Sequence, residues 1–212
     1  MDDSTRNRLM ADVARYYSTK IAEHGVQPRG VDWNGEESQV LRFVQLARII
    51  DRPDGFSIND LGCGYGALYA FLSVRHKTFQ YTGCDISEAM ISAARRRYGT
   101  CGNARFILSS IPPEAADYTV ASGVFNVRLH YSGNQWLEYV LHMLDLLDRA
   151  SCCGFAFNCL TSYSDAEKMR KDLYYADPCM VFDLCKRRYS RNVALLHDYG
   201  LYEFTVLVRK SP

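Results

Sequence analysis

The sequence lacks the features that would direct this chain into a membrane or a secretory route. No uncharged apolar run approaches the roughly 18–20 residues that cross a bilayer. The first residues contain no basic segment followed by an apolar stretch, so they do not read as a secretory signal. We therefore expect a cytoplasmic protein with no membrane partner.

A strong charge of either sign is also missing. Lysine and arginine number 25, aspartate and glutamate 24, and the formal net charge is +1. This balance provides no overall field to hold nucleic acid, and neither composition nor length indicates a basic face or an added RNA-binding domain. We expect no nucleic-acid partner.

The eight cysteines have no spacing typical of a metal centre. None forms a Cys-x-x-Cys pair, and no Cys/His cluster has zinc-ligand spacing. Several fall on predicted buried strands, where cysteine packs as a small hydrophobe. We interpret them as reduced thiols and expect no metal site.

Length and composition predict one domain, residues 1–212. The apolar fraction is 48% and the charged fraction 23%, as in soluble globular proteins. Residues 1–50 are predicted to hold two helices before any strand. One starts at Ser4 or Thr5 and stops near His24, and the other follows Asn34, whose spacing to Glu37 resembles a capping box.

Strands and helices alternate through the core, residues 55–212. The predicted strands are Phe56–Leu61, Phe79–Cys84, Arg105–Ser109, Asp117–Ser122 and Gly154–Cys159, and the helices between them include Ser87–Arg97 and Gln135–Leu147. Such alternation predicts a three-layer α/β fold with a parallel sheet covered on both faces. The last two predicted strands are Asn192–His197 and Tyr202–Val208. Their short connection, residues 198–201, fits only an antiparallel hairpin.

Three alternate glycines follow the first predicted strand. Gly62, Gly64 and Gly66 can adopt positive φ and let a ligand touch bare backbone. The apolar run from Ala67 predicts a helix whose N-terminus favours an anionic group. Asp85 ends the second strand, where a carboxylate is placed to accept ribose hydroxyls. Together these features predict a nucleoside-bearing ligand at the carboxyl ends of a parallel sheet.

Two cofactor classes fit the glycines. Gly62, Gly64 and Ala67 match the G-x-G-x-x-G/A pattern of nicotinamide-dinucleotide sites. However, Asp60 stands two residues before the first glycine, where a dinucleotide fold usually buries an apolar side chain. A carboxylate there suits a ligand with an ammonium group. The terminal hairpin also disfavours a dinucleotide fold of this length.

The segment from Asp60 to Gly66 resembles the first motif of the Rossmann-like (class I) S-adenosylmethionine (SAM)-dependent methyltransferases, and Asp85–Met90 resembles their second. The strand and helix pattern extends this resemblance over most of the chain. It implies a mostly parallel seven-stranded sheet with an antiparallel last strand and an N-terminal helical lid. It also implies SAM as cofactor, S-adenosylhomocysteine (SAH) as product, and methyl transfer to an oxygen or nitrogen of a small molecule, such as a sugar or a secondary metabolite.

The resemblance implies cofactor contacts at several positions. Asp60 and the loop would face the methionine moiety, Asp85 the ribose, and Ile86 and Met90 the adenine or ribose. Ser110 takes a place that is acidic in many relatives, and it accepts a hydrogen bond more weakly than a carboxylate. The complete expected set is Asp60, Gly62, Cys63, Gly64, Gly66, Asp85, Ile86, Met90, Ser110, Ile111, Ser122, Gly123, Val124, Tyr17 and Trp33.

Catalytic and acceptor residues are expected after the fourth and fifth strands. His130 and His197 are candidate bases, because histidine titrates near neutrality. The acceptor segment is about 158–191, and the expected acceptor contacts are Asn126, Arg128, Tyr131 and Asn158. Arg128 and the basic run 186–191 form a hypothetical site for a carboxylate or phosphate, the alternative being a solvated helix face.

Two other functions compete with methyl transfer. One is a nicotinamide-dependent oxidoreductase, which Asp60 and the terminal hairpin disfavour. The other is a non-catalytic SAM-binding protein. The intact glycine loop and Asp85 indicate ligand binding, but binding residues by themselves do not establish turnover.

Overall fold

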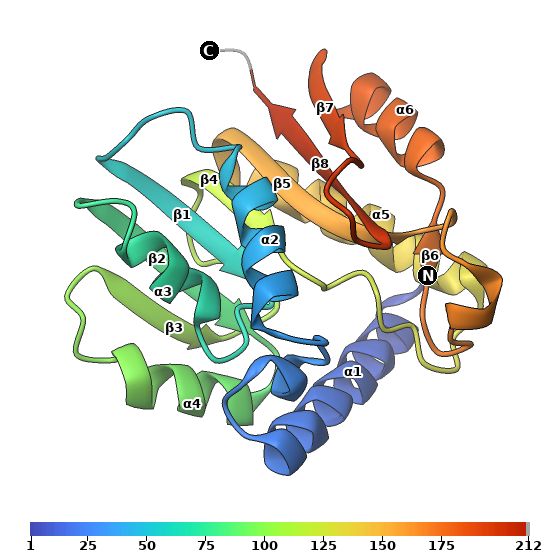
Figure 1. Ribbon diagram of the computed structural model, residues 1–212, viewed down its shortest axis with the longest axis horizontal. Coiled ribbons are helices and arrows are strands. Elements are labelled where there is room, and N and C mark those ends of the chain that lie inside the picture. Colours follow the sequence, from blue (N-terminus) through green and yellow to red (C-terminus); the bar gives the residue numbers. More distant parts are fainter. Residues whose placement is uncertain (211–212) are drawn as a thin grey trace.

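The structure is a computed structural model that describes residues 1–210, and it contains one mixed sheet between two layers of helices (Figure 1). The strand order is β3-β2-β1-β4-β5-β8-β7. The first five strands pair in parallel, and β8 is antiparallel to both β5 and β7. The strands are β1 (Phe56–Leu61), β2 (Phe79–Asp85), β3 (Ala104–Leu108), β4 (Ala116–Ala121), β5 (Ser151–Thr161), β7 (Asn192–Leu196) and β8 (Glu203–Arg209).

The predicted three-layer fold with a seven-strand path and an antiparallel terminal strand is confirmed. The structure adds a short strand, β6 (Tyr175–Ala176), which pairs with the end of β5 and brings the sheet to eight strands. A two-residue strand leaves no alternation in the sequence, so periodicity could not reveal it.

Six α-helices surround the sheet within the described residues. They are α1 (Asp3–His24), α2 (Glu36–Ala47), α3 (Ala67–Ser73), α4 (Glu88–Tyr98), α5 (Gly133–Arg149) and α6 (Pro178–Arg188). Two short 3-10 helices, η1 (Pro28–Val31) and η2 (Ala166–Lys168), lie in loops. Two predicted helix starts were wrong. Asp2 caps α1 by accepting a hydrogen bond from the Thr5 amide, and Gly35 rather than Asn34 precedes α2.

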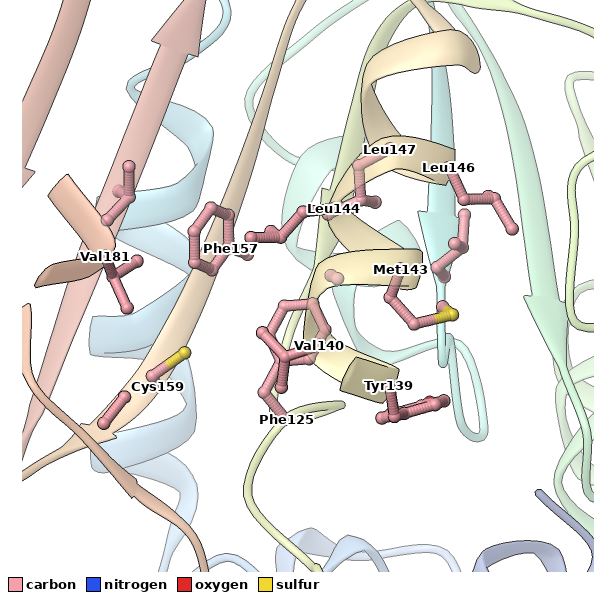
Figure 2. Packing of buried hydrophobic residues seen from close by; sticks show 14 of the residues in the cluster. Phe125, Tyr139, Val140, Met143, Leu144, Leu146, Leu147, Phe157, Cys159 and Val181 are labelled. Atoms are coloured by element: carbon pink, nitrogen blue, oxygen red, sulfur yellow. The ribbon is translucent and has the colours of Figure 1, made fainter. Parts of the chain in front are cut away.

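The sheet has an apolar core on each face. Residues of α2, α3 and α4 pack with Phe56, Ile58 and Tyr81 on one face. On the other, α5 and α6 pack against Phe155 and Phe157. Figure 2 shows the second core, in which side chains from α5 meet those of β5 and α6. Successive side chains of a strand point to opposite faces, so β5 contributes to both cores.

Helix α1 lies across the end of the sheet toward which β1 points (Figure 1). Leu9 and Val13 are buried in the core that α5 forms, and Ile21 packs in a smaller cluster with Tyr65 and Met90. The helix therefore covers the carboxyl ends of the strands while its apolar residues belong to the folded core. Its role as a lid stays a prediction.

Candidate functional site

The loop after β1 has backbone geometry that requires glycine. The φ angles of Gly62, Gly64 and Gly66 are +72°, +54° and +84°, a region that L side chains rarely adopt. A Cβ on Gly62 would lie 2.5 Å from the Val124 side chain, and one on Gly64 would lie 3.1 Å from Val31. The loop can therefore place backbone against a ligand, as the sequence predicted.

Asp85 is the last residue of β2, and its side chain hydrogen-bonds to the glycine loop. Its Oδ2 accepts a 2.9 Å hydrogen bond from the Gly64 amide, and its Oδ1 accepts one of 2.8 Å from the Ser87 amide. Burial raises the pKa of Asp85, and these amide hydrogen bonds oppose the shift. Each carboxylate oxygen has two acceptor positions. The side chain is therefore fixed in orientation and still able to accept hydrogen bonds from two hydroxyls.

Asp60 is a buried carboxyl group with one unused oxygen. The Tyr81 hydroxyl donates to its Oδ2 at 2.5 Å, and Oδ1 has no hydrogen-bond partner. Burial raises the pKa of Asp60 to about 7, an effect that the Tyr81 hydrogen bond opposes and the charge of Asp85 increases. The hydroxyl of Ser122 is likewise buried without a partner. Both orphaned atoms belong to residues lining one cavity, so that cavity offers a ligand unmet polar groups.

This first cavity brings together most of the predicted cofactor residues. Gly66 and Ile111 do not line it, because Gly66 lies against Tyr98 and Ile111 is half exposed outside. The predicted residues that do line it are Asp60, Gly62, Cys63, Gly64, Asp85, Ile86, Met90, Ser110, Ser122, Gly123, Val124, Tyr17 and Trp33.

Several lining residues were not expected from the sequence. Met10 and Val13 come from α1, and Tyr139 and Met143 come from α5. Burial raises the pKa of the Tyr139 hydroxyl, which keeps it neutral. In the sequence these residues form ordinary amphipathic helix patterns, which do not separate a core contact from a ligand contact.

A second cavity of about 610 Å³ adjoins the first. Tyr17, Val31, Trp33 and Gly123 line both. The rest of its wall includes Leu160, Ser164, Lys168, Arg170, Leu173 and Tyr175 from the predicted acceptor segment. The part of that segment near residues 160–175 therefore faces a cavity, whereas the basic run 186–191 lines neither cavity.

A buried polar network forms one side of the second cavity. Arg42 donates from Nε and Nη2 to both carboxylate oxygens of Glu203, at 2.8 and 2.7 Å. Asn158 donates to Oε2 of Glu203 at 2.5 Å, and its Oδ1 accepts a 2.8 Å hydrogen bond from the Gly123 amide. The Arg42 guanidinium stacks on Trp33, 3.9 Å from the ring centre. Asn158 thus links Glu203 to the backbone of Gly123, which lines both cavities.

The other predicted acceptor residues have structural partners. Arg128 donates to the backbone carbonyls of Leu173, Tyr131 and Lys171, at 2.9, 2.6 and 2.7 Å. Because all three guanidinium nitrogens are used in this way, Arg128 holds two loops together. Its expected contact with the acceptor stays a prediction. Tyr131 is buried and donates to Asp12. Asn126 lines the second cavity, where its Oδ1 accepts a hydrogen bond from the Leu160 amide.

The basic run and the histidines lie elsewhere. Arg187 pairs with Asp183 on the exposed side of α6, and Arg188 pairs with Asp145 of α5. His130 stacks on Tyr131, and His197 lies beside Tyr163 and Phe204. Both histidines are exposed, and no histidine is among the residues that line either cavity. The geometry does not support the predicted catalytic role of these histidines.

Two further expectations concern metals and membranes. Among residues 1–210, no group of three or more His, Cys, Asp or Glu side chains is arranged to hold a metal ion. The eight cysteines are free thiols. No helix in the same range is long and apolar enough to cross a membrane. The cytoplasmic location stays a prediction.

Comparison with known proteins identifies the family. A family described as "Methyltransferase domain" matches residues 58–149. The Mycobacterium tuberculosis protein Rv1506c, which is named as a methyltransferase with no acceptor stated, is 60% identical over 164 residues. That match covers 77% of this chain and 99% of the relative. The chain belongs to the class I SAM-dependent methyltransferases.

Solved structures agree with this fold at low sequence identity. The DhpI–SAH complex has a TM-score of 0.67 and 15% identity, covering 96% of this chain and 98% of that one. Magnesium protoporphyrin IX methyltransferase (ChlM) of Synechocystis PCC 6803, solved with bound SAM, has a TM-score of 0.55 and 17% identity. Its match covers 82% of this chain and 77% of that chain. Membership of a methyltransferase family argues against the oxidoreductase alternative.

Proposed function

We propose that this chain transfers a methyl group from SAM to an oxygen or nitrogen of a small-molecule acceptor. The observation that carries the proposal is the pair of adjoining cavities. The first contains Asp60, the glycine loop and Asp85, and the second opens from the same wall at Tyr17, Trp33 and Gly123. Two reactants can therefore meet across one boundary, which is the geometry that a group transfer needs.

The residues of the first cavity fit the cofactor. Asp85 has free acceptor positions for the ribose hydroxyls, as the carboxylate at this strand end does in related α/β sites. The unpartnered Oδ1 of Asp60 would accept from the ammonium group of the methionine moiety. Tyr139, Met143 and Met10 supply an apolar and aromatic wall. SAM supplies a methyl group on an activated leaving group.

The chain's own contribution is to align the acceptor and exclude water. Tyr17 and Trp33 stand at the boundary of the cavities, and α1 covers the strand ends. Burial raises the pKa of the Tyr17 hydroxyl, so it is neutral and able to donate a hydrogen bond. We propose no general base from the histidines, since His130 and His197 are exposed outside both cavities.

A small molecule is the acceptor class that best suits the second cavity, which is partly open. Its volume of about 610 Å³ lies within the range of small-molecule sites. The name of one structural relative, magnesium protoporphyrin IX methyltransferase, also states a small-molecule acceptor. The net charge of +1 provides no general attraction to RNA.

The proposal is tested in two steps. Calorimetry should first detect SAH binding with a micromolar-range Kd, roughly −8 kcal/mol, and no binding of NAD. Purified protein with SAM is then screened against pooled metabolites for release of SAH. A protein that binds NAD but neither SAM nor SAH would contradict the proposal, and turnover only with RNA would contradict the acceptor class.

A further inference from the structure

One guanidinium nitrogen in the wall of the second cavity has no partner. Arg42 is only 6% exposed, and its Nε and Nη2 are both used by Glu203. Its Nη1, which carries two N–H groups, is buried and makes no hydrogen bond. A buried charged donor without an acceptor is unfavourable, and such groups are rare in folded proteins.

The neighbours of Arg42 provide no hydrogen-bond acceptor for Nη1. Trp33 stacks on the guanidinium at 3.9 Å, but a stacked ring contacts the flat face, whereas the N–H bonds point outward in the plane. The Glu203 oxygens already accept from Nε and Nη2 of Arg42 and from Asn158. Nη1 is covered in the ligand-free protein, but Arg42 lines the second cavity, so a ligand that enters there and reaches Nη1 would supply the acceptor.

Most of the charged side chains that line this cavity are already paired. The three cations are Arg42, Lys168 and Arg170, and the two carboxylates are Asp32 and Glu203. Glu203 is committed to Arg42, and Asp32 is shared between Lys20 and Arg170. Arg170 also pairs with Asp172, and Lys168 pairs with Asp165. Nη1 of Arg42 is left as a buried donor without a partner, and an anionic ligand would form charge-assisted hydrogen bonds with it.

We propose that the acceptor carries an anionic oxygen group, a carboxylate or a phosphoryl group, that binds Nη1 of Arg42 in the second cavity. Lys168, in the same lining, adds to the attraction. This inference rests on the proposed function, because it specifies the acceptor of the same methyl transfer. The sequence placed a hypothetical anion site at Arg128 and residues 186–191. This inference places it instead at Arg42, which is buried in the wall of the second cavity.

The test uses the full chain saturated with SAH and two simple anions as probes, succinate and inorganic phosphate. Binding is measured by calorimetry at an ionic strength held constant with sodium chloride. The main variant is the double substitution Arg42→Gln with Glu203→Gln, which removes both charges together so that neither stays buried alone. Lys168→Gln is a second variant. Arg187→Gln is the matched control, because it loses the same charge outside both cavities.

Unmodified protein and the Arg187→Gln control should bind at least one probe with similar affinity. The double variant and Lys168→Gln should bind it at least tenfold more weakly, and the affinity of all four proteins for SAH should agree within about threefold. If the double variant does not fold, Lys168→Gln carries the test.

Three outcomes overturn the inference while leaving SAH binding, and so the proposed function, intact. Neither anion binds the SAH complex, or both cavity variants bind as well as the unmodified protein, or the control loses as much affinity as they do. An acceptor screen adds an independent check with acids and their neutral methyl esters in separate pools. Release of SAH from the ester pool alone would also overturn it. Failure of SAH itself to bind would instead contradict the proposed function.

Discussion

The Tyr81 hydroxyl donates a 2.5 Å hydrogen bond to the carboxyl group of Asp60, which lines the first cavity. Asp60 is buried, its second oxygen has no partner, and its pKa is about 7 because burial disfavours the charged form. The group therefore titrates near neutrality in the ligand-free protein. Two consequences can be measured, one for stability and one for cofactor binding.

Asp60→Asn should remove a pH dependence of stability. The folded pKa of about 7 is raised above the ordinary value of 3.8, so the folded protein holds a proton that the unfolded chain releases between those pH values. Stability should therefore fall as pH rises from about 4 to about 7. Each unit of pKa shift corresponds to about 1.4 kcal/mol, so Asp60→Asn should raise the free energy of unfolding at pH 8 by up to a few kcal/mol.

Urea denaturation of both proteins at pH 5 and pH 8 checks this effect. Asp54→Asn is a control with the opposite sign. Asp54 accepts hydrogen bonds from the Lys77 and Thr78 amides, which lower its pKa. Its contribution is present above pH 4 and lost as pH falls, so this control should be slightly less stable at pH 8. If Asp60→Asn is no more stable than its parent at pH 8, burial of the Asp60 carboxylate does not destabilise the folded protein, and its pKa is not raised as stated.

Cofactor binding should release a proton from Asp60. An ammonium group beside the carboxylate favours its charged form, so binding should lower the pKa of Asp60 below the assay pH. Calorimetry of SAH binding at pH 6.5 in two buffers of different ionisation enthalpy should show release of part of one proton. Asp60→Asn should bind more weakly and release none from this position. Equal proton release by both proteins would place the ammonium group away from Asp60.

Asp85→Ala should weaken SAH binding by about 1.5–3 kcal/mol, because charge-assisted hydrogen bonds to the ribose would be lost. It also leaves the Gly64 and Ser87 amides without their carboxylate acceptor. Asp85→Asn keeps one acceptor oxygen and should lose less. Titration calorimetry with circular dichroism of each variant separates weaker binding from misfolding. An affinity unchanged in Asp85→Ala would rule out the ribose contact.

The glycine loop can be tested with a pair of matched substitutions. Gly62→Ala places a Cβ 2.5 Å from Val124 at a φ of +72°. We expect a loss of at least about 1–2 kcal/mol of unfolding free energy from the backbone conformation alone, together with weaker SAH binding. Gly102→Ala has open space and no positive φ, so it should change neither quantity. Thermal unfolding and calorimetry of both variants give the comparison.

The cofactor half of the site could be predicted because its determinants are local. Asp60, the three glycines and Asp85 lie within one strand–turn–helix–strand unit, and that unit forms as its spacing predicts. The same holds for the sheet, since alternating strands and helices restrict the topology to a few possibilities. The terminal hairpin could also be predicted from local sequence, because residues 198–201 are too few to connect two parallel strands.

The acceptor half could not be predicted because its determinants are distant in sequence. Arg42 and Glu203 are 161 residues apart and meet only after α2 packs beside β8. Arg128 follows a strand end as expected, but two of its three carbonyl partners, Leu173 and Lys171, lie on a loop some 45 residues further on. No sequence pattern shows whether a guanidinium will meet such carbonyls. Whether an arginine binds a ligand or backbone carbonyls depends on loop packing, which residue periodicity does not describe.

A network of hydrogen bonds and ion pairs connects α1 to the loop that faces it. Asp32, just after η1, accepts hydrogen bonds from Tyr16 of α1 at 2.8 Å and from Arg170 of the acceptor segment at 3.3 Å. Lys20 of α1 lies 3.3 Å from the other Asp32 oxygen. This network connects the helix that covers the first cavity to the loop that lines the second. We predict that it holds the two together when the reactants are bound.

Arg170→Gln should loosen this connection without unfolding the protein, because Arg170 is about half exposed. Exposed ion pairs contribute about 0.2–1 kcal/mol each, so SAH affinity should fall no more than about fivefold. Hydrogen exchange over residues 5–35 should slow when SAH binds the unmodified protein and should slow less in the variant. Turnover should fall more than SAH affinity, since the acceptor loop is also released. Arg187→Gln, which breaks an exposed pair on α6, should leave exchange and turnover unchanged. If SAH leaves exchange at residues 5–35 unaltered even in the unmodified protein, α1 is a fixed part of the fold and does not act as a lid.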